Sequence, residues 1–203
     1  SVNTLVTQVQ ALKNLINEFR DYARLPSAKL APLNLNDLVN EVMALYGQAL
    51  EQGTLSLDLA AELPSIQGDA ALLRQVVHNL VQNALDAALD AAQDTSPQRA
   101  AERGPARVTV RTDTPRNEDG SIRAVRLAVR DNGPGIAKQD QILIFERHFS
   151  QGKQLATGLR EEGHRGIGLA LARQLALAQG WSLSVQSGPD GKGCIFKLDL
   201  DPS

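Results

Sequence analysis

The stretch "DNGPGI", residues 131–136, follows the segment "AVRLAVR", in which apolar and other residues alternate. The alternation predicts a half-buried β-strand, and glycine and proline so close together predict that this strand ends in a turn. Gly133 and Gly135 can adopt backbone angles closed to other residues and leave room for a ligand to approach, while Asp131 and Asn132 bring polar groups to the turn. These six residues alone leave two interpretations open, a plain surface turn and a turn that meets a ligand.

Strands and helices interleave on both sides of this turn. Strands are predicted at 54–60, 65–69, 106–112 and 124–130, with a turn at 117–121, and in a final hairpin of 181–187 and 194–200 around "PDGKG". Helices are predicted at 2–24, 69–92 and 166–179, from the turn to about Phe145, and after a short strand within 33–50, with Asn36 or Asp37 near the N-cap. Residues 93–105 are polar, contain two prolines and are expected to form a mobile loop. The pattern predicts an α/β sandwich, a mixed sheet covered by helices on one face.

Composition narrows the class of protein. The 203 residues are 42% hydrophobic and only 3% aromatic, so aliphatic side chains must build the core. A net charge of −2 leaves no basic face for nucleic acid. The single cysteine, Cys194, excludes an internal disulfide and fits a reducing compartment, and three scattered histidines with it make a structural zinc site improbable. No apolar run approaches the ~20 residues that span a bilayer.

The first helix carries a heptad seam formed by Val2, Leu5, Val9, Leu12, Ile16 and Phe19. It is either a core helix that packs on its own domain or one helix of a dimeric bundle. Pro26 and Pro32 after it indicate a linker and favour the bundle. The chain starts at Ser1 within this helical pattern, so we expect a fragment of a longer protein. The expected parts are this helix (1–25), a linker (26–32) and a second domain (33–203), and the resemblance described below implies that the helix is the second one of a dimerisation hairpin.

The helix predicted at 69–92 carries a row of polar side chains opposite an apolar face made of Leu73, Val76, Val77, Leu80 and Val81. Asn79 and Asn83 are four residues apart and lie along one side of the helix. Asp86 follows on the same side, and His78 borders it. Buried without partners, each group would cost about 1–3 kcal/mol. The row is either a solvated face or a set of oxygen ligands for Mg²⁺, which accepts carbonyl and carboxylate oxygens and shares phosphates.

Gly166 and Gly168 stand where the helix predicted at 166–179 begins. Glycines there expose backbone N–H groups, and the helix dipole adds positive potential, so phosphate is the natural ligand. The preceding stretch contains Lys153, Arg160, His164 and Arg165, and it is either an ordinary solvated loop or a flexible segment that closes over a polyanion.

In this order the motifs resemble the GHKL superfamily of ATP-binding domains, and within it the catalytic domain of bacterial sensor histidine kinases. "HNLVQNALDA" resembles the N box, "DNGPGI" the first glycine box, "IFERHFS" the F box and "GIGLALA" the second glycine box, over residues 33–200. "INEFRDYARLP" followed by "LNLNDLV" is further similar to nitrogen-regulation kinases of the NtrY and NtrB type. The resemblance implies the two-layer Bergerat fold, with ATP and Mg²⁺ as ligands.

The resemblance also implies residue roles. Asp131 accepts a hydrogen bond from the adenine amino group, and the glycines of its turn pass beneath the nucleotide. Asn83 ligates the metal, with Asn79 close to the phosphates or the metal, and these two are the catalytic pair. Phe145 and Phe149 anchor the base of a lid at 150–165 by packing. The implied ATP site comprises Asn79, Asn83, Asp86, Asp131, Gly133, Gly135, Ile136, Phe145, Arg165, Gly166, Ile167, Gly168 and Leu169.

The chain departs from the family pattern in its second glycine box. The family writes G-T-G-L-G-L, whereas His164 and Arg165 occupy the first two positions here, so one phosphate-facing glycine is missing although Gly163 stands one residue earlier. This departure leaves open a nucleotide-binding module without kinase activity. An ATP-hydrolysing relative is disfavoured, because such proteins place a water-activating glutamate where Asn79 stands, and an amide has no usable basicity.

The resemblance finally implies partners and a location. The γ-phosphoryl group of ATP goes to a histidine on a helical hairpin whose first helix is absent here, so this fragment is not expected to phosphorylate itself. The other implied partners are a cognate response regulator and a second copy of the full-length protein, without nucleic acid. The expected location is the cytoplasm, as the cytoplasmic portion of a membrane-anchored bacterial sensor.

Overall fold

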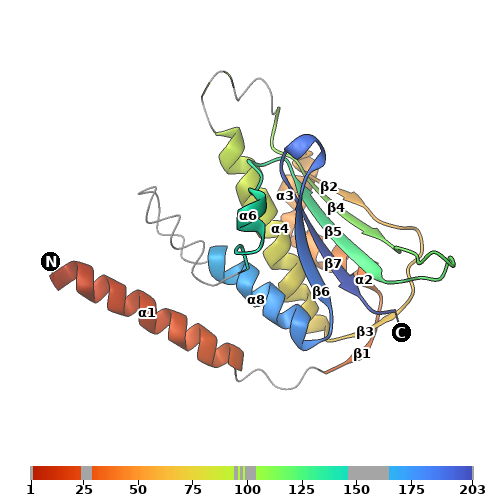
Figure 1. Ribbon diagram of the computed structural model, residues 1–203, viewed down its shortest axis with the longest axis horizontal. Helices are drawn as coiled ribbons and strands as arrows, with labels where there is room; N and C mark the ends of the chain where they lie inside the picture. Colours follow the sequence, from red (N-terminus) through yellow and green to blue (C-terminus); the bar gives the residue numbers. More distant parts are fainter. Residues whose placement is uncertain are drawn as a thin grey trace.

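A computed structural model describes residues 2–23, 29–93, 96, 98, 104–145 and 165–202 (Figure 1). Within these ranges, the description of residues 13–23 and 165–168 covers the backbone alone. Residues 150–164 of the predicted lid and Phe149 lie outside the described residues, and so does most of the loop predicted at 93–105.

The helices and strands follow one another as the sequence predicts, with small differences in their ends. In chain order they are α1 (Val2–Ala23), β1 (Ala31–Leu33), α2 (Leu35–Met43), η1 (Ala44–Tyr46), α3 (Gly47–Glu51), β2 (Leu55–Asp58), β3 (Ile66–Gly68), α4 (Ala70–Ala92), β4 (Val108–Asp113), β5 (Val125–Asp131), α6 (Lys138–Gln141), α8 (Arg165–Ala178), β6 (Ser182–Ser187), η2 (Pro189–Gly191) and β7 (Cys194–Leu200).

Five of the strands form one mixed sheet in the order β2-β4-β5-β7-β6. β2 runs parallel to β4, and the remaining neighbours are antiparallel. β1 and β3 pair separately as a two-stranded ribbon. The long helices α4 and α8 lie side by side against one face of the sheet, and α2 packs against α4 (Figure 1). The predicted α/β sandwich with a mixed sheet is therefore confirmed.

The core lies between the sheet and these helices. β5 buries every second residue, with Val125, Leu127 and Val129 inward, and β7 does the same with Phe196 and Leu198. This is the period-2 burial expected of a sheet with one covered face. The apolar face predicted on α4 is buried as well, because all five of its predicted members are inaccessible to solvent.

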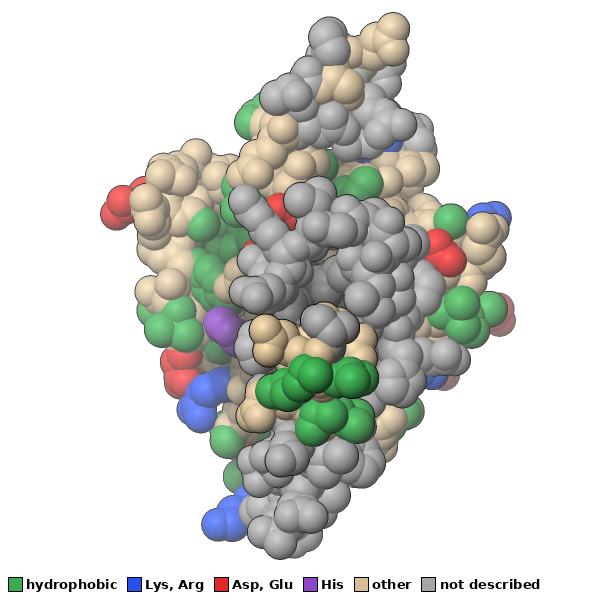
Figure 2. Space-filling model, turned by 90° about the vertical axis from the view of Figure 1, so that its left-hand side faces the viewer, with side chains coloured by type: hydrophobic (Ala, Val, Ile, Leu, Met, Phe, Trp, Pro, Cys, Tyr) green, Lys and Arg blue, Asp and Glu red, His purple; other side chains and the backbone are tan. Residues whose placement is uncertain are grey.

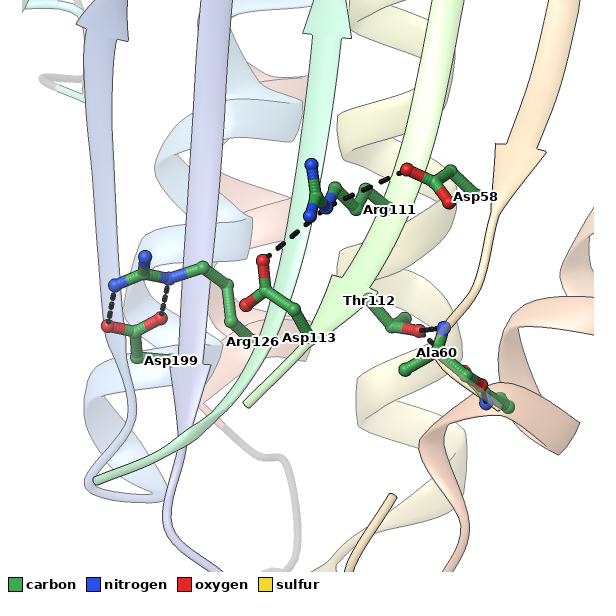
Figure 3. Close-up of polar contacts among 8 residues, drawn as sticks. Asp58, Ala60, Arg111, Thr112, Asp113, Arg126 and Asp199 are labelled. Carbon is green, nitrogen blue, oxygen red and sulfur yellow. Dashed lines mark hydrogen bonds and ion pairs between the residues drawn. The ribbon is translucent and has the colours of Figure 1, made fainter. Parts of the chain in front are cut away.

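The open face of the sheet is polar and held by ion pairs (Figure 3). Arg126 donates to both carboxylate oxygens of Asp199, at 2.7 and 2.9 Å. Arg111 lies between Asp58 and Asp113, at 3.7 and 3.6 Å. The exposed pairs of Arg111 contribute little to stability individually, whereas the pair of Arg126 and Asp199 is bidentate and partly buried.

A buried hydrogen-bond network closes the end of the sheet where β2 stops. The Thr112 hydroxyl donates to Oδ1 of Asn36 at 2.8 Å and accepts the Ala60 N–H at 2.9 Å. Nδ2 of Asn36 donates to the Ala60 carbonyl at 2.8 Å. The network ties the first turn of α2 to β4 and to the segment after β2 (Thr112 and Ala60 in Figure 3).

The N-cap of helix α2 is Asn34, whose side chain accepts the Asp37 N–H at 3.2 Å, close to the predicted Asn36 and Asp37. The predicted extent of two helices was wrong. The helix over 33–50 is interrupted by the 3₁₀ turn η1, and α6 ends at Gln141, so the helical stretch toward Phe145 is shorter than predicted. β1 begins at Ala31, within the stretch predicted as the linker at 26–32.

The apolar seam of α1 is exposed as far as its side chains are described. Val2 is 76% exposed, and the exposed fractions of Leu5, Val9 and Leu12 lie between 51% and 63%. Hydrophobic side chains gather over this helix on the face shown in Figure 2. The interpretation of α1 as a core helix is therefore wrong for this part of the seam. Among the described residues, no helix combines the length and the apolar character needed to cross a membrane.

Candidate functional site

Helix α4 presents the predicted polar row beside the sheet. Its N-terminus is fixed by Asp69, whose Oδ1 accepts the N–H groups of Ala71 and Leu72 at 3.0 and 3.2 Å. The apolar side of α4 packs into the core, so Asn79 and Asn83 lie half-buried at the edge of the buried face of the helix. The sequence prediction that these amides share one side of a long helix is confirmed.

The three polar side chains of the row differ in their partners. Oδ1 of Asn79 accepts a hydrogen bond from Nε2 of Gln75 at 2.9 Å, and Oδ1 of Asp86 accepts one from Nε2 of Gln82 at 3.1 Å. The side chain of Asn83 accepts no hydrogen bond from the described part of the chain. A half-exposed amide oxygen of this kind suits a cation such as Mg²⁺, which keeps waters and completes its shell with phosphate.

Asp131 ends β5 and is the carboxylate nearest the predicted turn. Its side chain is only 3% exposed, and Oδ1 accepts the Gly133 N–H at 2.8 Å. Burial raises the pKa of Asp131 to about 6, against the opposing effect of the N–H groups of Gly133 and Cys194. A carboxylate kept at this electrostatic cost accepts hydrogen bonds and donates none when ionised, which suits recognition of an N–H donor on a ligand.

The glycines of the turn are required by the protein's own packing. A Cβ on Gly133 would lie 3.0 Å from the carbonyl oxygen of Ala87 on α4, so no side chain fits there. Gly135 has a φ of +80° and faces the carbonyl of Gly193. The turn therefore packs between α4 and the start of β7. Its contact on α4, Ala87, lies one helical turn after Asn83. The close contact that the structure shows at Gly133 is with the helix, and the approach of a ligand to this turn stays a prediction.

Asn132 has a structural role within the same turn. Its Oδ1 accepts the Arg107 N–H at 2.8 Å, and its Nδ2 donates to the Pro105 carbonyl at 2.8 Å. These bonds fix the segment that leads into β4. Gln141, which the sequence prediction passed over, donates to the Ile136 carbonyl at 3.1 Å and to Oγ of Ser187 at 3.0 Å. The end of the turn is thereby held to β6.

Phe145 packs rather than reacts, as predicted. It is buried, meets Phe196 edge-on with ring centroids 6.1 Å apart, and lies under the guanidinium of Arg173 at 5.1 Å. Ile136 is partly buried against the same core, and Leu169 is buried on α8. Phe145 and Leu169 therefore belong to the hydrophobic core, and Ile136 packs against it.

Helix α8 begins at Arg165, so Gly166, Ile167 and Gly168 form its first turn. The prediction that the glycine pair opens a helix is confirmed. First-turn N–H groups have no acceptor within their own helix, and α8 packs directly on α4. The described backbone thus brings this helix start onto the same layer as the Asn79 row.

Cys194 is a neighbour of the site that sequence reasoning missed. It pairs with Asp131 in the register of β5 and β7 and is buried. Burial, with the charge of Asp131, raises the pKa of its thiol to about 12, so the thiol stays protonated. Nothing in the sequence pattern indicates this neighbour, because the register of two strands 63 positions apart is a tertiary property.

Comparisons with known proteins agree with this geometry. The family model described as histidine kinase-, DNA gyrase B- and HSP90-like ATPase matches residues 68–203. The adaptive-response sensory kinase SasA of Synechocystis sp. is 30% identical over 95% of this chain and 42% of its own length. The sensor histidine kinase AruS of Pseudomonas aeruginosa is 31% identical over 98% of this chain and 19% of its own. The chain spans less than half the length of these relatives.

Solved structures give the same result. The full-length kinase ShkA in complex with AMPPNP superimposes with a TM-score of 0.63 at 25% identity, covering 93% of this chain and 35% of ShkA. The histidine kinase ThkA in complex with the response regulator TrrA superimposes with a TM-score of 0.65, at 18% identity, over 99% of this chain and 50% of ThkA. The second likeness concerns the fold alone.

The family and the fold expected from the sequence are thus confirmed, and the relatives are sensor kinases of several kinds. The match from residue 68 to the end includes the α4 polar row, the Asp131 turn and the start of α8. With the ATP-binding catalytic fold of sensor histidine kinases, this chain belongs to the family of histidine kinase-, DNA gyrase B- and HSP90-like ATPases.

Proposed function

We propose that this chain binds ATP with Mg²⁺ and transfers the γ-phosphoryl group to a histidine side chain. The observation that carries the proposal is the pairing of a buried carboxylate, Asp131, with an amide row on the adjacent helix, the two joined where Gly133 contacts Ala87. The carboxylate accepts a hydrogen bond from the adenine amino group. The side-chain amides of Asn79 and Asn83 lie where the phosphates of the same nucleotide extend along α4.

Asp131 binds the adenine base, and Ile136, Phe145 and Leu169 line the nucleotide pocket. Asn83 is the metal ligand, because its amide oxygen is the one in the row without a hydrogen bond among the described residues.

The phosphate end of the site is formed by Asn79, Asp86 and the first turn of α8. Asn79 lies beside the phosphates, and the N–H groups of Arg165, Gly166 and Gly168 meet them at the helix start. The first turn carries Ile167 between the two glycines and leads into Leu169.

The transfer itself needs positioning and neutralisation of charge. The bond between the γ-phosphorus and the bridging oxygen breaks, ADP leaves with that electron pair, and the acceptor imidazole nitrogen forms the new phosphorus–nitrogen bond. Mg²⁺, when bound, neutralises phosphate charge. The protein's own part is to hold the base at Asp131 and the phosphates at the Asn79 row, so that the γ-phosphorus faces the acceptor.

Two alternatives are weaker. Hydrolysis needs a base beside the metal-binding amide, and the side chain one turn before Asn83 is the amide of Asn79. A module that binds nucleotide without transferring it remains the second candidate, because His164 and Arg165 replace the first positions of the usual second glycine box.

The acceptor histidine and the partners belong to the longer protein. We infer a helical hairpin of which α1 is the second helix, since α1 exposes an apolar seam suited to a partner helix. This hairpin makes the full-length protein a homodimer and delivers the phosphoryl group to a response regulator. The segments "INEFRDYARLP" and "LNLNDLV" support a nitrogen-regulation system of the NtrY and NtrB type. The parent is proposed as a membrane-anchored sensor with this domain in the cytoplasm.

The test is calorimetric titration of the chain with ATP, with and without Mg²⁺, followed by addition of a separate acceptor hairpin and labelled ATP. Mg²⁺-dependent binding and acid-labile phosphohistidine on the added hairpin, with none on this chain alone, are expected. Binding without transfer would favour the non-catalytic module. Absence of ATP binding at saturating Mg²⁺ would refute the proposal.

A further inference from the structure

The stretch that joins α1 to β1 is hydrogen-bonded to the start of α4. The N–H of Lys29 donates to Oδ2 of Asp69 at 2.9 Å, across 40 positions of the sequence. Lys29 lies two residues before β1, and Asp69 directly follows β3, the strand with which β1 pairs. This hydrogen bond, the linker contact, therefore continues the pairing of the two strands past the end of the ribbon.

The carboxylate of Asp69 serves two elements, one with each oxygen. Oδ1 caps α4 by accepting the N–H groups of Ala71 and Leu72 at 3.0 and 3.2 Å, and Oδ2 accepts the N–H of Lys29. These N–H groups, that of Lys29 first, hold the pKa of Asp69 below its ordinary value against the opposing effect of burial. The carboxylate is therefore ionised at neutral pH and is an acceptor at both oxygens.

The backbone of Asp69 is bonded to a third element, the end of α8. Its N–H donates to Oε1 of Gln179 at 3.2 Å. Gln179 is the first residue after α8, and its Nε2 donates to the carbonyl of Leu175 within that helix at 3.4 Å. The preceding residue, Gly68, is buried, and a Cβ there would lie 3.0 Å from Cζ2 of Trp181. Asp69 thus contacts the stretch before β1, the start of α4 and the end of α8.

The same two helices carry the proposed nucleotide site at a distance from Asp69. α4 begins and α8 ends beside the ribbon of β1 and β3 (Figure 1). Asn79 lies about 15 Å along the axis of α4 from Asp69, at 1.5 Å per residue. Gly166 and Gly168 are at the opposite end of α8 from Gln179. Both helices therefore connect Asp69 with the site.

We propose that Asp69 is a positioning residue that couples the linker contact to nucleotide binding. The inference rests on the proposed function, which places the triphosphate against α4 and the first turn of α8. A ligand that contacts both helices restricts their movement relative to each other, so less conformational entropy is lost when Asp69, Gln179 and Lys29 are held together. The coupling is reciprocal, because the linker contact must favour ATP binding by the factor by which ATP favours the linker contact.

Two variants of Asp69 remove the linker contact and keep the helix cap. In Asp69→Asn the amide oxygen still accepts the first N–H groups of α4, and the amide nitrogen, itself a donor, replaces the oxygen that faces the N–H of Lys29. Asp69→Ser also caps the helix and has no second oxygen. Both variants are expected to unfold in urea at a midpoint close to that of the wild type, whereas Asp69→Ala loses the cap as well.

Amide hydrogen exchange, followed residue by residue by NMR, measures the linker contact directly. In the nucleotide-free proteins, the Lys29 N–H is expected to exchange at least about fivefold faster in Asp69→Asn and Asp69→Ser than in the wild type. In the wild type, ATP with Mg²⁺ is expected to slow the same exchange about fivefold or more. Calorimetric titration should then show ATP binding weakened in both variants by a factor of similar size.

The matched control is Asp119 in the turn between β4 and β5. Its Oδ1 accepts the N–H of Ser121 at 2.9 Å, so it is also an aspartate that holds an exposed backbone N–H. ATP should leave the exchange of the Ser121 N–H unchanged, and Asp119→Asn should bind ATP like the wild type.

The proposal is supported if both cap-preserving variants exchange Lys29 faster and bind ATP more weakly, and if ATP slows this exchange in the wild type. It is overturned if ATP leaves the exchange of Lys29 unchanged, or if Asp69→Asn exchanges Lys29 like the wild type. A loss of ATP affinity in Asp69→Ala alone also overturns it, because capping would then be the whole role of Asp69. A wild-type chain that binds no ATP refutes the proposed function and the coupling with it, an outcome distinct from a chain that binds ATP with no effect on Lys29.

Discussion

Replacing Asp131 with asparagine should make the protein more stable and a poorer binder of ATP. Asp131→Asn keeps the shape of the side chain, and the new amide oxygen can still accept the Gly133 N–H that Oδ1 now accepts at 2.8 Å. The turn should therefore keep its conformation. What changes is the charge, in a side chain that is 3% exposed.

The gain in stability follows from the pKa of the carboxyl group. Burial raises the pKa of Asp131 from 3.8 to about 6 in the folded protein, which corresponds to roughly 3 kcal/mol against the ionised form. Because the folded pKa lies above the unfolded one, this penalty is absent below about pH 4, grows as the pH rises toward 6 and is complete above it. At pH 8 the variant should be more stable by about 1–3 kcal/mol, and the two proteins should converge near pH 4.

The loss in affinity follows from the proposed contact with the adenine amino group. A hydrogen bond to a charged acceptor contributes about 1.5–3 kcal/mol, and the amide also turns a donor toward another donor. ATP should bind roughly 10- to 150-fold more weakly to Asp131→Asn. Inorganic triphosphate, which has no base, should bind about equally to both proteins.

Urea unfolding at pH 4 and pH 8 measures the first effect, and calorimetry with ATP and triphosphate measures the second. The reasoning fails if the variant is less stable than the wild type at pH 8, or if the difference in the free energy of unfolding does not change with pH. If the ATP affinity of the variant is unchanged, Asp131 does not contact the adenine base, although the cost of its buried charge would still hold.

The other predictions concern the metal ligand, the buried network and the start of β7. Asn83→Ala should abolish the Mg²⁺ dependence of ATP binding in calorimetry while changing the free energy of unfolding by less than about 0.5 kcal/mol, because its side chain has no hydrogen bond among the described residues. Thr112→Val leaves Asn36 and the Ala60 N–H without their partner and should cost about 2–4 kcal/mol in urea unfolding, and a loss below about 0.5 kcal/mol would contradict the network. Gly193→Ala puts a methyl group against the backbone of the turn, at a residue with a φ of +66°. It should lower the urea midpoint of unfolding and also weaken ATP binding, and a change in only one of the two would contradict this expectation.

The sequence by itself determined the order of the elements and the residue types of the site. Period-2 alternation before "DNGPGI" predicted β5, and the 3.6-residue spacing of apolar residues predicted both the buried face of α4 and the amide row on its other side. These features are local, because each depends on residues within one or two turns of the chain. For the same reason the glycine pair at the start of α8 was placed correctly.

Only the tertiary structure determined which side chains from distant parts of the chain contact one another. Thr112 joins the amide of Asn36 to the Ala60 N–H, and Cys194 is the neighbour of Asp131 through the register of β5 and β7. Such contacts join residues tens of positions apart, so their energies depend on how the whole chain packs, and no short-range pattern in the sequence records them.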